Sequence, residues 1–225
     1  MKTRISLLLV LGFAIAMTSC MQGPQGEKVK TGDATEVQYP KDAIELNANL
    51  DASTIEWLGT KPTGTHFGTL SVQDGSVFIK DGKLLGGKFV MNMNSIVVLD
   101  IKDETMNANL VGHLKSADFF LVDSFPTATF EFSNVVPFES TGEIVEGVVP
   151  THRLEGNLTM RGVTRKVNFP ARIEVGDKWV KAETPQFVLN RTEWNVNYGS
   201  RSIFANLKDN FIHDEMGITI KLSTK

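Results

Sequence analysis

The chain has 225 residues, of which 41% are hydrophobic and 22% charged, a composition typical of an ordinary globular protein. Its formal net charge of -3 provides no basic excess for neutralising phosphates, so a nucleic-acid partner is not expected. The single cysteine, Cys20, excludes an intramolecular disulfide and a metal site built from several thiolates.

Residues 1–19 have the layout of a cleavable signal peptide. Two basic residues precede an apolar run over residues 5–17, which as a helix would span about 20 Å and is too short for a ~30 Å hydrocarbon core. The run ends in Met17-Thr18-Ser19-Cys20, which resembles a bacterial lipobox with Met17 in place of the commoner Leu. The resemblance implies that Cys20 is the lipid-modified first residue of the mature chain. The alternative is an ordinary signal peptide followed by an incidental cysteine.

Residues 20–41 are predicted to be a lipidated N-terminus followed by a flexible linker. Residues 21–41 hold three glycines, two prolines and few large apolar side chains. A flexible chain of this length has a mean reach of roughly 25 Å. Removing the two basic residues of the leader leaves 21 Lys and Arg against 26 Asp and Glu, a net charge of -5. We therefore expect acyl chains, and not anionic head groups, to provide the attachment to a membrane.

From Asp42 to the C-terminus, short segments alternate apolar with polar residues, as half-buried strands do. The Asp74-Gly75 and Asp81-Gly82 pairs are predicted to be hairpin turns. About eight strands without a regular alternation of strand and helix favour an antiparallel barrel or sandwich in one domain, residues 42–225. The strands are expected near residues 53–58, 70–72, 77–80, 88–93, 128–132, 154–160, 167–173, 187–191 and 218–222.

One segment, residues 104–125, departs from this pattern. Its apolar residues Met106, Leu110 and Leu114 recur with the period of a helix, and acidic residues lie at its start and basic residues near its end. We expect a single helix inserted at one end of the barrel. Residues 137–151 are rich in Glu and Gly and are predicted to form a long exposed hairpin.

The sequence contains no motif for metal, phosphate or nucleophilic chemistry. Its four histidines occur without HxH or HExxH spacing, and neither a GxSxG elbow nor a Walker loop is present. No metal and no cofactor are therefore expected.

The candidate ligand contacts are large side chains on the apolar faces, with His66 and Arg191 as candidates for a polar head group. Each also has a structural explanation: His66 as a hydrogen-bonded core or rim residue, Met91 and Met93 as core filler, and Arg191 as the partner of a buried carboxylate. An eight-stranded barrel is wide enough either to fill itself or to hold one small ligand. The full set is Trp57, His66, Phe89, Met91, Met93, Phe119, Phe120, Phe130, Phe132, Phe187, Arg191 and Trp194.

Three stretches resemble the YceI-like family, lipocalin-like proteins that bind long isoprenoid lipids in the periplasm or outside the cell. They are Gly86-Gly87-Lys88-Phe89-Val90-Met91-Asn92-Met93-Asn94-Ser95-Ile96, His113-Leu114-Lys115-Ser116-Ala117-Asp118-Phe119-Phe120 with Phe125-Pro126-Thr127-Ala128-Thr129-Phe130, and Gly156-Asn157-Leu158-Thr159-Met160-Arg161-Gly162-Val163-Thr164-Arg165 with Phe187 to Trp194. The resemblance covers roughly residues 45–223. It implies an extended antiparallel eight-stranded barrel with a helix at one end and a hydrophobic tunnel, and it supplies no catalytic residues. Two departures are Asn195, where the family commonly has Gly, and a longer insertion at 137–151.

The leading hypothesis is a lipid-anchored binding or transport protein that shelters an isoprenoid, quinone-like or fatty-acyl lipid in the barrel. The residue after Cys20 is Met21 and not Asp, which favours the outer membrane of a bacterial cell envelope. One alternative is an enzyme acting on such a lipid or on a quinone, with His66, His113 and Asp118 as acid–base groups. Another is a non-catalytic surface lipoprotein whose barrel is filled by its own aromatic side chains. The sequence leaves a homodimer open.

Overall fold

The structure, a computed structural model, describes residues 22–139 and 147–225. The expected signal peptide, Cys20 and the centre of the expected 137–151 hairpin lie outside the described residues.

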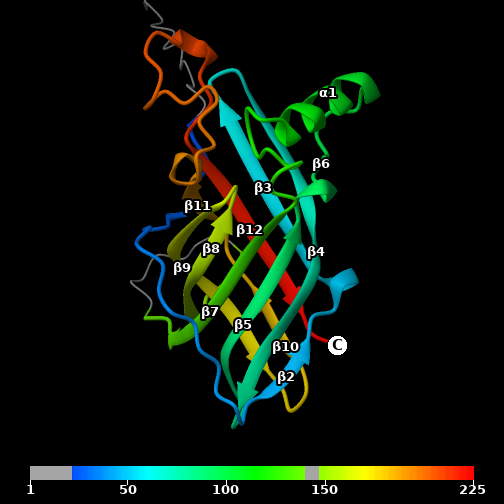
Figure 1. Cartoon of the computed structure of the whole chain (residues 1–225), viewed down its shortest axis with the longest axis vertical. Helices are drawn as coiled ribbons and strands as arrows, with labels where there is room; N and C mark the ends of the chain where they lie inside the picture. Colours follow the sequence, from blue (N-terminus) through cyan, green and yellow to red (C-terminus); the bar gives the residue numbers. More distant parts are fainter. Residues whose placement is uncertain (1–21, 140–146) are drawn as a thin grey trace, which may run out of the picture.

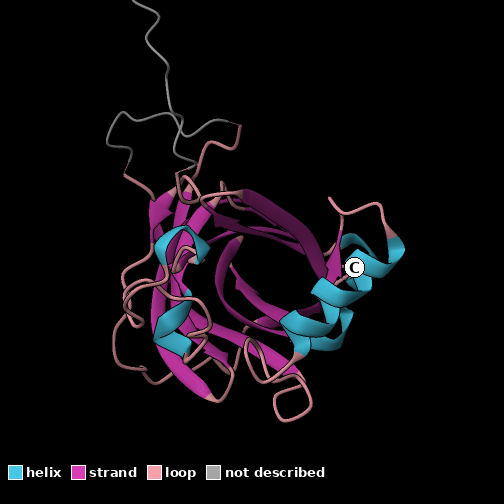
Figure 2. Cartoon of the chain, turned by 90° about the horizontal axis from the view of Figure 1, so that it is seen from above, coloured by secondary structure: helices cyan, strands magenta, loops and turns pink. Residues whose placement is uncertain are grey.

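Eight antiparallel strands close a barrel around a single interior, which confirms the predicted fold (Figures 1 and 2). The barrel closes because the last strand pairs with the first along residues 54–59 and 216–221. In order around the barrel the strands are β3 (Thr54–Lys61), β4 (Gly64–Lys80), β5 (Lys83–Asn92), β7 (Thr127–Pro137), β8 (His152–Met160), β9 (Val163–Val175), β10 (Val180–Glu183) and β12 (Glu215–Ser223).

Shorter elements extend this barrel at its edges. β11 (Phe187–Asn190) pairs with β12, β2 (Ile44–Asn47) and β6 (Val97–Val98) pair with β4, and β1 (Glu27–Lys28) pairs in parallel with β11. The 3-10 helices are η1 (Leu50–Ala52), η2 (Met93–Ser95), η3 (Arg191–Trp194) and η4 (Lys208–Asn210).

The alternating residues of β7 show how the pleat builds the interior. Ala128, Phe130 and Phe132 are buried, whereas Thr129 and Glu131 between them are only partly buried. Because successive side chains of a strand point to opposite faces, a period of two in the sequence fixes which set faces inward.

The predicted turn at Asp74-Gly75 is wrong, because both residues lie inside the 17-residue strand β4. The pairing of β4 with β5 shifts register between Val72 and Asp74, so a bulge stands where the sequence predicts a turn. A Cβ on Gly75 would lie 2.5 Å from the ring of Phe89, so the glycine allows close packing here. The Asp81-Gly82 turn is confirmed: its two residues have φ of 51° and 70°, as a two-residue hairpin of type I′ requires.

The predicted helix is α1 (Glu104–Lys115), which begins with the Asp103 carboxylate accepting a hydrogen bond from the Met106 N–H. It lies at one end of the barrel, at the edge of the ring seen in Figure 2. We call this the helix end, which also carries residues 195–212; the far end carries the β4–β5 turn and β2 (Figure 1). Among the helices of the described residues, none is long and apolar enough to cross a bilayer.

The segment 22–41, expected to be a flexible linker, instead lies along the outside of the barrel as the N-terminal strap (blue in Figure 1). β1 adds to β11, and Gly32 exchanges backbone hydrogen bonds with Lys166 on β9. Nearer the far end, the Tyr39 hydroxyl donates to the Gly87 carbonyl, and its ring stacks on Phe78 with centroids 4.1 Å apart. Burial, and secondarily Glu131, raise the pKa of Tyr39 to about 12. The low apolar content of the strap hid these contacts, because most are made by polar side chains and by the backbone.

Candidate ligand-binding cavity

The helix-end half of the barrel encloses a cavity whose wall is almost entirely apolar. The space in which a water-sized sphere can move is about 170 Å³. A single water needs roughly 10–15 Å³ by the same measure, so the cavity has room for on the order of ten water-sized groups, such as methylenes. Nine of the twelve predicted contacts line it: Trp57, Phe89, Met91, Met93, Phe119, Phe120, Phe130, Phe187 and Arg191.

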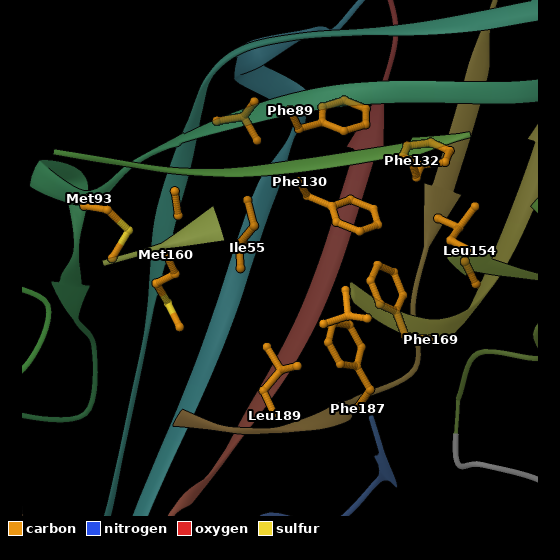
Figure 3. Close-up of a cluster of buried hydrophobic side chains, with 14 of the residues drawn as sticks. Ile55, Phe89, Met93, Phe130, Phe132, Leu154, Met160, Phe169, Phe187 and Leu189 are labelled. Carbon is orange, nitrogen blue, oxygen red and sulfur yellow. The ribbon is translucent and has the colours of Figure 1, made fainter. Parts of the chain in front are cut away.

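The far half of the barrel is filled by phenylalanine rings that pack against one another (Figure 3). The rings of Phe130 and Phe132 lie 5.3 Å apart and those of Phe130 and Phe169 lie 5.1 Å apart. The row continues into the main cavity, where the ring of Phe187 lies 4.4 Å from that of Phe169. A second space of only about 30 Å³ lies beyond them. Phe89, Phe130 and Phe169 line both spaces and therefore form the floor of the main cavity.

Three predicted contacts do not line the main cavity. His66 lies at the helix end of β4, with its Nδ1 2.8 Å from the Asp100 carboxylate. Phe132 faces the smaller space, and Trp194 is fully buried and donates its indole N–H to the Leu158 carbonyl. The alternation of residues in β4 places His66 correctly on the inward face of the strand. It does not tell how far along the barrel His66 lies.

Arg191 borders the cavity, yet its guanidinium is used by the protein itself. Its nitrogens donate to the carbonyls of Val196, Ile212 and His213 at 2.5, 3.1 and 3.1 Å. Burial lowers the pKa of Arg191, and the Asp214 carboxylate, 3.7 Å away, opposes this shift. These bonds favour the structural explanation of Arg191, since they tie η3 to the chain entering β12.

Two polar residues of the wall were missed by the sequence analysis. His213 has its Nδ1 2.8 Å from the Thr60 hydroxyl, and Glu215 lies 2.9 Å from the Lys28 ammonium, whose hydrogen bond lowers the pKa of Glu215. The alternation in β12 marks Met216 as inward-facing and gives no sign that its neighbour Glu215 borders the cavity. No local pattern marks His213, because it precedes the strand. Among the described residues, the indole nitrogen of Trp57 is buried without a hydrogen-bond partner.

Further apolar contacts come from strand faces that the sequence analysis recognised without selecting their residues as ligand contacts. Leu158 and Met160 on β8, and Ile218 and Ile220 on β12, contribute to the wall. Leu114 of α1 contributes from the helix end, where the predicted contacts Phe119 and Phe120 also lie.

The acid–base residues of the enzyme hypothesis do not converge on this cavity. His113 Nε2 lies 3.0 Å from the Asp118 carboxylate on the α1 side, while His66 pairs with Asp100, and none of these four lines the cavity. Within residues 22–139 and 147–225, no group of three or more His, Cys, Asp or Glu side chains is placed to hold a metal ion.

Comparison with known proteins agrees with this architecture. A UPF0312 protein of Azotobacter vinelandii is 34% identical over 115 residues, covering 50% of this chain; the match spans about half (53%) of that protein's own length. The crystal structure of Burkholderia cenocepacia BcnA superposes with a TM-score of 0.56 at 18% identity, over 79% of this chain and 99% of BcnA. A polyisoprenoid binding domain from Saccharophagus degradans, implicated in plant cell wall breakdown, superposes with a TM-score of 0.53 at 12% identity, over 80% and 97% of the two chains. At such identities the two structures establish the fold alone.

The family assignment comes from the sequence itself. The YceI-like domain model matches residues 45–224, which is every strand of the closed barrel together with α1. The chain therefore belongs to the YceI-like family.

Proposed function

We propose that the protein binds and transports an isoprenoid or a similar amphiphilic lipid, with its chain in the cavity of the helix-end half. The observation that carries this proposal is a cavity of about 170 Å³ with an apolar wall inside a closed barrel. Ten methylenes buried there would contribute roughly 8 kcal/mol before costs, which corresponds to about micromolar affinity. The polyisoprenoid-binding domain of Saccharophagus supports this class of ligand.

The wall chemistry favours binding over catalysis. Arg191 is committed to backbone carbonyls, and Thr60 and Lys28 engage His213 and Glu215. The unpartnered indole N–H of Trp57 is suited to one acceptor oxygen, such as that of a polyprenol or a quinone. A long hydrocarbon with one small polar group matches this wall better than a highly polar substrate does.

Mass spectrometry of lipids extracted from natively purified protein tests this proposal, followed by uptake of a fluorescent polyprenyl ligand. Ala128→Phe adds a ring to the cavity wall and should abolish saturable uptake. Thr129→Phe adds the same ring on the outer face of β7 and should leave uptake intact. Absence of both co-purified lipid and saturable uptake in the unmodified protein would contradict the proposal.

The second part of the proposal is attachment to the outer membrane of a bacterial cell envelope through acylated Cys20. Its support is the lipobox-like Met17-Thr18-Ser19-Cys20 at the end of the apolar run. In the native host, the unmodified protein should fractionate with outer membranes and carry acyl chains on its N-terminal peptide, and Cys20→Ala should carry none. An unacylated mature N-terminus in the unmodified protein would refute this part and leave the lipid-binding part standing.

A further inference from the structure

The floor of the main cavity divides the barrel interior into two spaces. Besides the three phenylalanines of the floor, Ile220 and Leu222 of β12 line both the main cavity and the smaller space. On β7, Ala128 lines the main cavity and Phe132 the smaller space, with Phe130 between them lining both. Because the strand continues past the floor, side chains and not the end of a strand make this division.

The rings of the floor are held in place by their neighbours (Figure 3). Phe130 lies between Phe132 and Phe169, with ring centroids 5.3 and 5.1 Å away, and is 7% exposed. Phe169 is 3% exposed, and its ring stacks on that of Phe187 with an angle of 3° between the planes. Rings packed in this way do not turn aside without displacing their neighbours, so the depth of the cavity is fixed.

The wall above the floor is more adaptable. It contains four methionines, Met91, Met93, Met160 and Met216. Methionine is unbranched and polarizable and has three rotatable bonds, so it adjusts to ligands of different shape. The wall can therefore accommodate chains of different width, whereas the floor limits how far any chain enters.

We propose that the floor selects ligands by the length of their chain. The cavity of about 170 Å³ has room for about ten carbons, and the space of about 30 Å³ beyond the floor is closed to them. The ligand is then an amphiphile with a chain of about ten carbons, either straight or built from isoprene units, and a longer chain leaves its excess outside the cavity. Phe130 is the main specificity-determining residue, because its ring joins those of the far half to those of the cavity. This inference rests on the proposed function, since it requires a lipid chain in the cavity.

A series of primary alcohols tests the inference on the unmodified full chain, stripped of co-purified lipid. Dissociation constants for hexanol, octanol, decanol, dodecanol and tetradecanol are measured by displacement of a fluorescent polyprenyl ligand. Each methylene that enters the cavity should tighten binding about fourfold. This gain should end near decanol, so dodecanol and tetradecanol should bind about as tightly as decanol. Geraniol, a branched alcohol with as many carbons as decanol, should bind within several-fold of it because the methionine wall adapts.

Phe130→Leu and Phe132→Leu are matched substitutions at successive inward positions of β7. Phe130→Leu opens the floor toward the smaller space, so tetradecanol should bind several-fold tighter than decanol. Phe132→Leu removes the same ring from below the floor and should leave the limit near decanol. Circular dichroism checks that both variants are folded, and the alcohol series in the unmodified chain decides the proposal if either is not.

A gain in affinity that continues to tetradecanol in the unmodified chain would overturn the inference. So would an equal shift of the limit in the two folded variants, or none in Phe130→Leu. Rejection of geraniol would also overturn it, because it would show selection by shape and not by length. Binding of none of the alcohols or the polyprenyl ligand would contradict the proposed function itself, whereas binding without a length limit would leave that function standing.

Discussion

The two halves of the barrel share most of their strands but have opposite interiors. In the far half, Phe130, Phe132 and Phe169 pack against one another and leave about 30 Å³; in the helix-end half, the strands surround about 170 Å³. Both walls contain aromatic and aliphatic side chains, but the helix-end wall also contains four methionines, whereas the far wall contains Phe132 and no methionine. A period of two specifies both halves equally, so the sizes of the inward side chains decide where the barrel stays hollow.

The halves also differ in the interactions that stabilise them. The far half depends on packing between rings. The helix end depends on individual polar contacts, such as the bonds of Arg191 to three carbonyls and of Arg161 to the carbonyls of Asn195 and Ala117. These hydrogen bonds act together with packing, since Trp194 and Val196 beside them are fully buried.

The largest expected effect comes from removing a ring of the far half. Phe132 is 2% exposed, so Phe132→Ala should lower the free energy of unfolding by about 3–5 kcal/mol in urea titrations. Phe120→Ala is the matched control, because Phe120 is only partly buried and already borders open space. If Phe132→Ala and Phe120→Ala lowered the free energy of unfolding equally, the two halves would not differ in how tightly they are packed.

The next effect tests the polar support of the helix end. Arg191→Met keeps an apolar side chain beside the cavity but leaves the carbonyls of Val196, Ile212 and His213 without their donor. We expect the free energy of unfolding to fall by about 2–3 kcal/mol, with faster proteolysis within residues 197–212. The control is Arg172→Met, which removes the exposed Arg172–Glu174 ion pair and should change neither the free energy of unfolding nor the rate of proteolysis. If Arg191→Met retained native stability, packing and not hydrogen bonding would support this end.

A smaller effect is expected at Asn195, whose backbone conformation would suit glycine. Asn195 ends η3 with φ of 61°, a left-handed conformation that asparagine adopts more readily than most residues. Asn195→Ala should cost about 1 kcal/mol in thermal unfolding, and Asn195→Gly should be close to neutral. If both variants were equally destabilised, the Asn195 side chain and not its backbone conformation would be the cause.

The smallest effect is a pH dependence at Asp100. Burial alone would raise the pKa of Asp100, but hydrogen bonds from the Phe67 N–H and from His66 lower it overall. The stabilisation is therefore complete above the ordinary carboxyl pKa of about 3.9 and is lost as the pH falls through the lower folded value. Asp100→Asn should reduce the free energy of unfolding by less than about 1 kcal/mol at pH 7 and flatten its decline between pH 5 and pH 3. If Asp100→Asn left the decline of the free energy of unfolding between pH 5 and pH 3 unchanged, the Asp100 carboxylate would not be its cause.

The barrel could be predicted because its strands and helix leave periodic signals. Alternation locates β7 and β12, and a capped 3.6-residue period locates α1. Asp74-Gly75 misleads because a bulge and a hairpin turn use the same residues, and only the Phe89 ring across the strand distinguishes them. The strap was mistaken for a linker because its contacts are hydrogen bonds of polar side chains and of the backbone, which a low apolar content does not reveal.

The cavity was less predictable, because a strand pattern gives the face of a residue and not its height along the barrel. Trp57 and Met91 line the cavity, whereas Phe132, equally inward, fills the far half, and His66 lies at the helix end. Arg191 shows the same limitation for polar groups: its position was correctly expected to be buried, but its partners are carbonyls of a loop with no sequence pattern.

The strap also determines how the molecule responds to mechanical load. A pull on the N-terminus from a membrane would act along the outside of the barrel and reach the contacts in chain order: first Gln25 with Gln186, then β1 with β11 and Gly32 with Lys166, and last Tyr39 with Gly87. The closed barrel would bear force only after this series had separated. The strap would therefore extend under such a load before the closed barrel was strained.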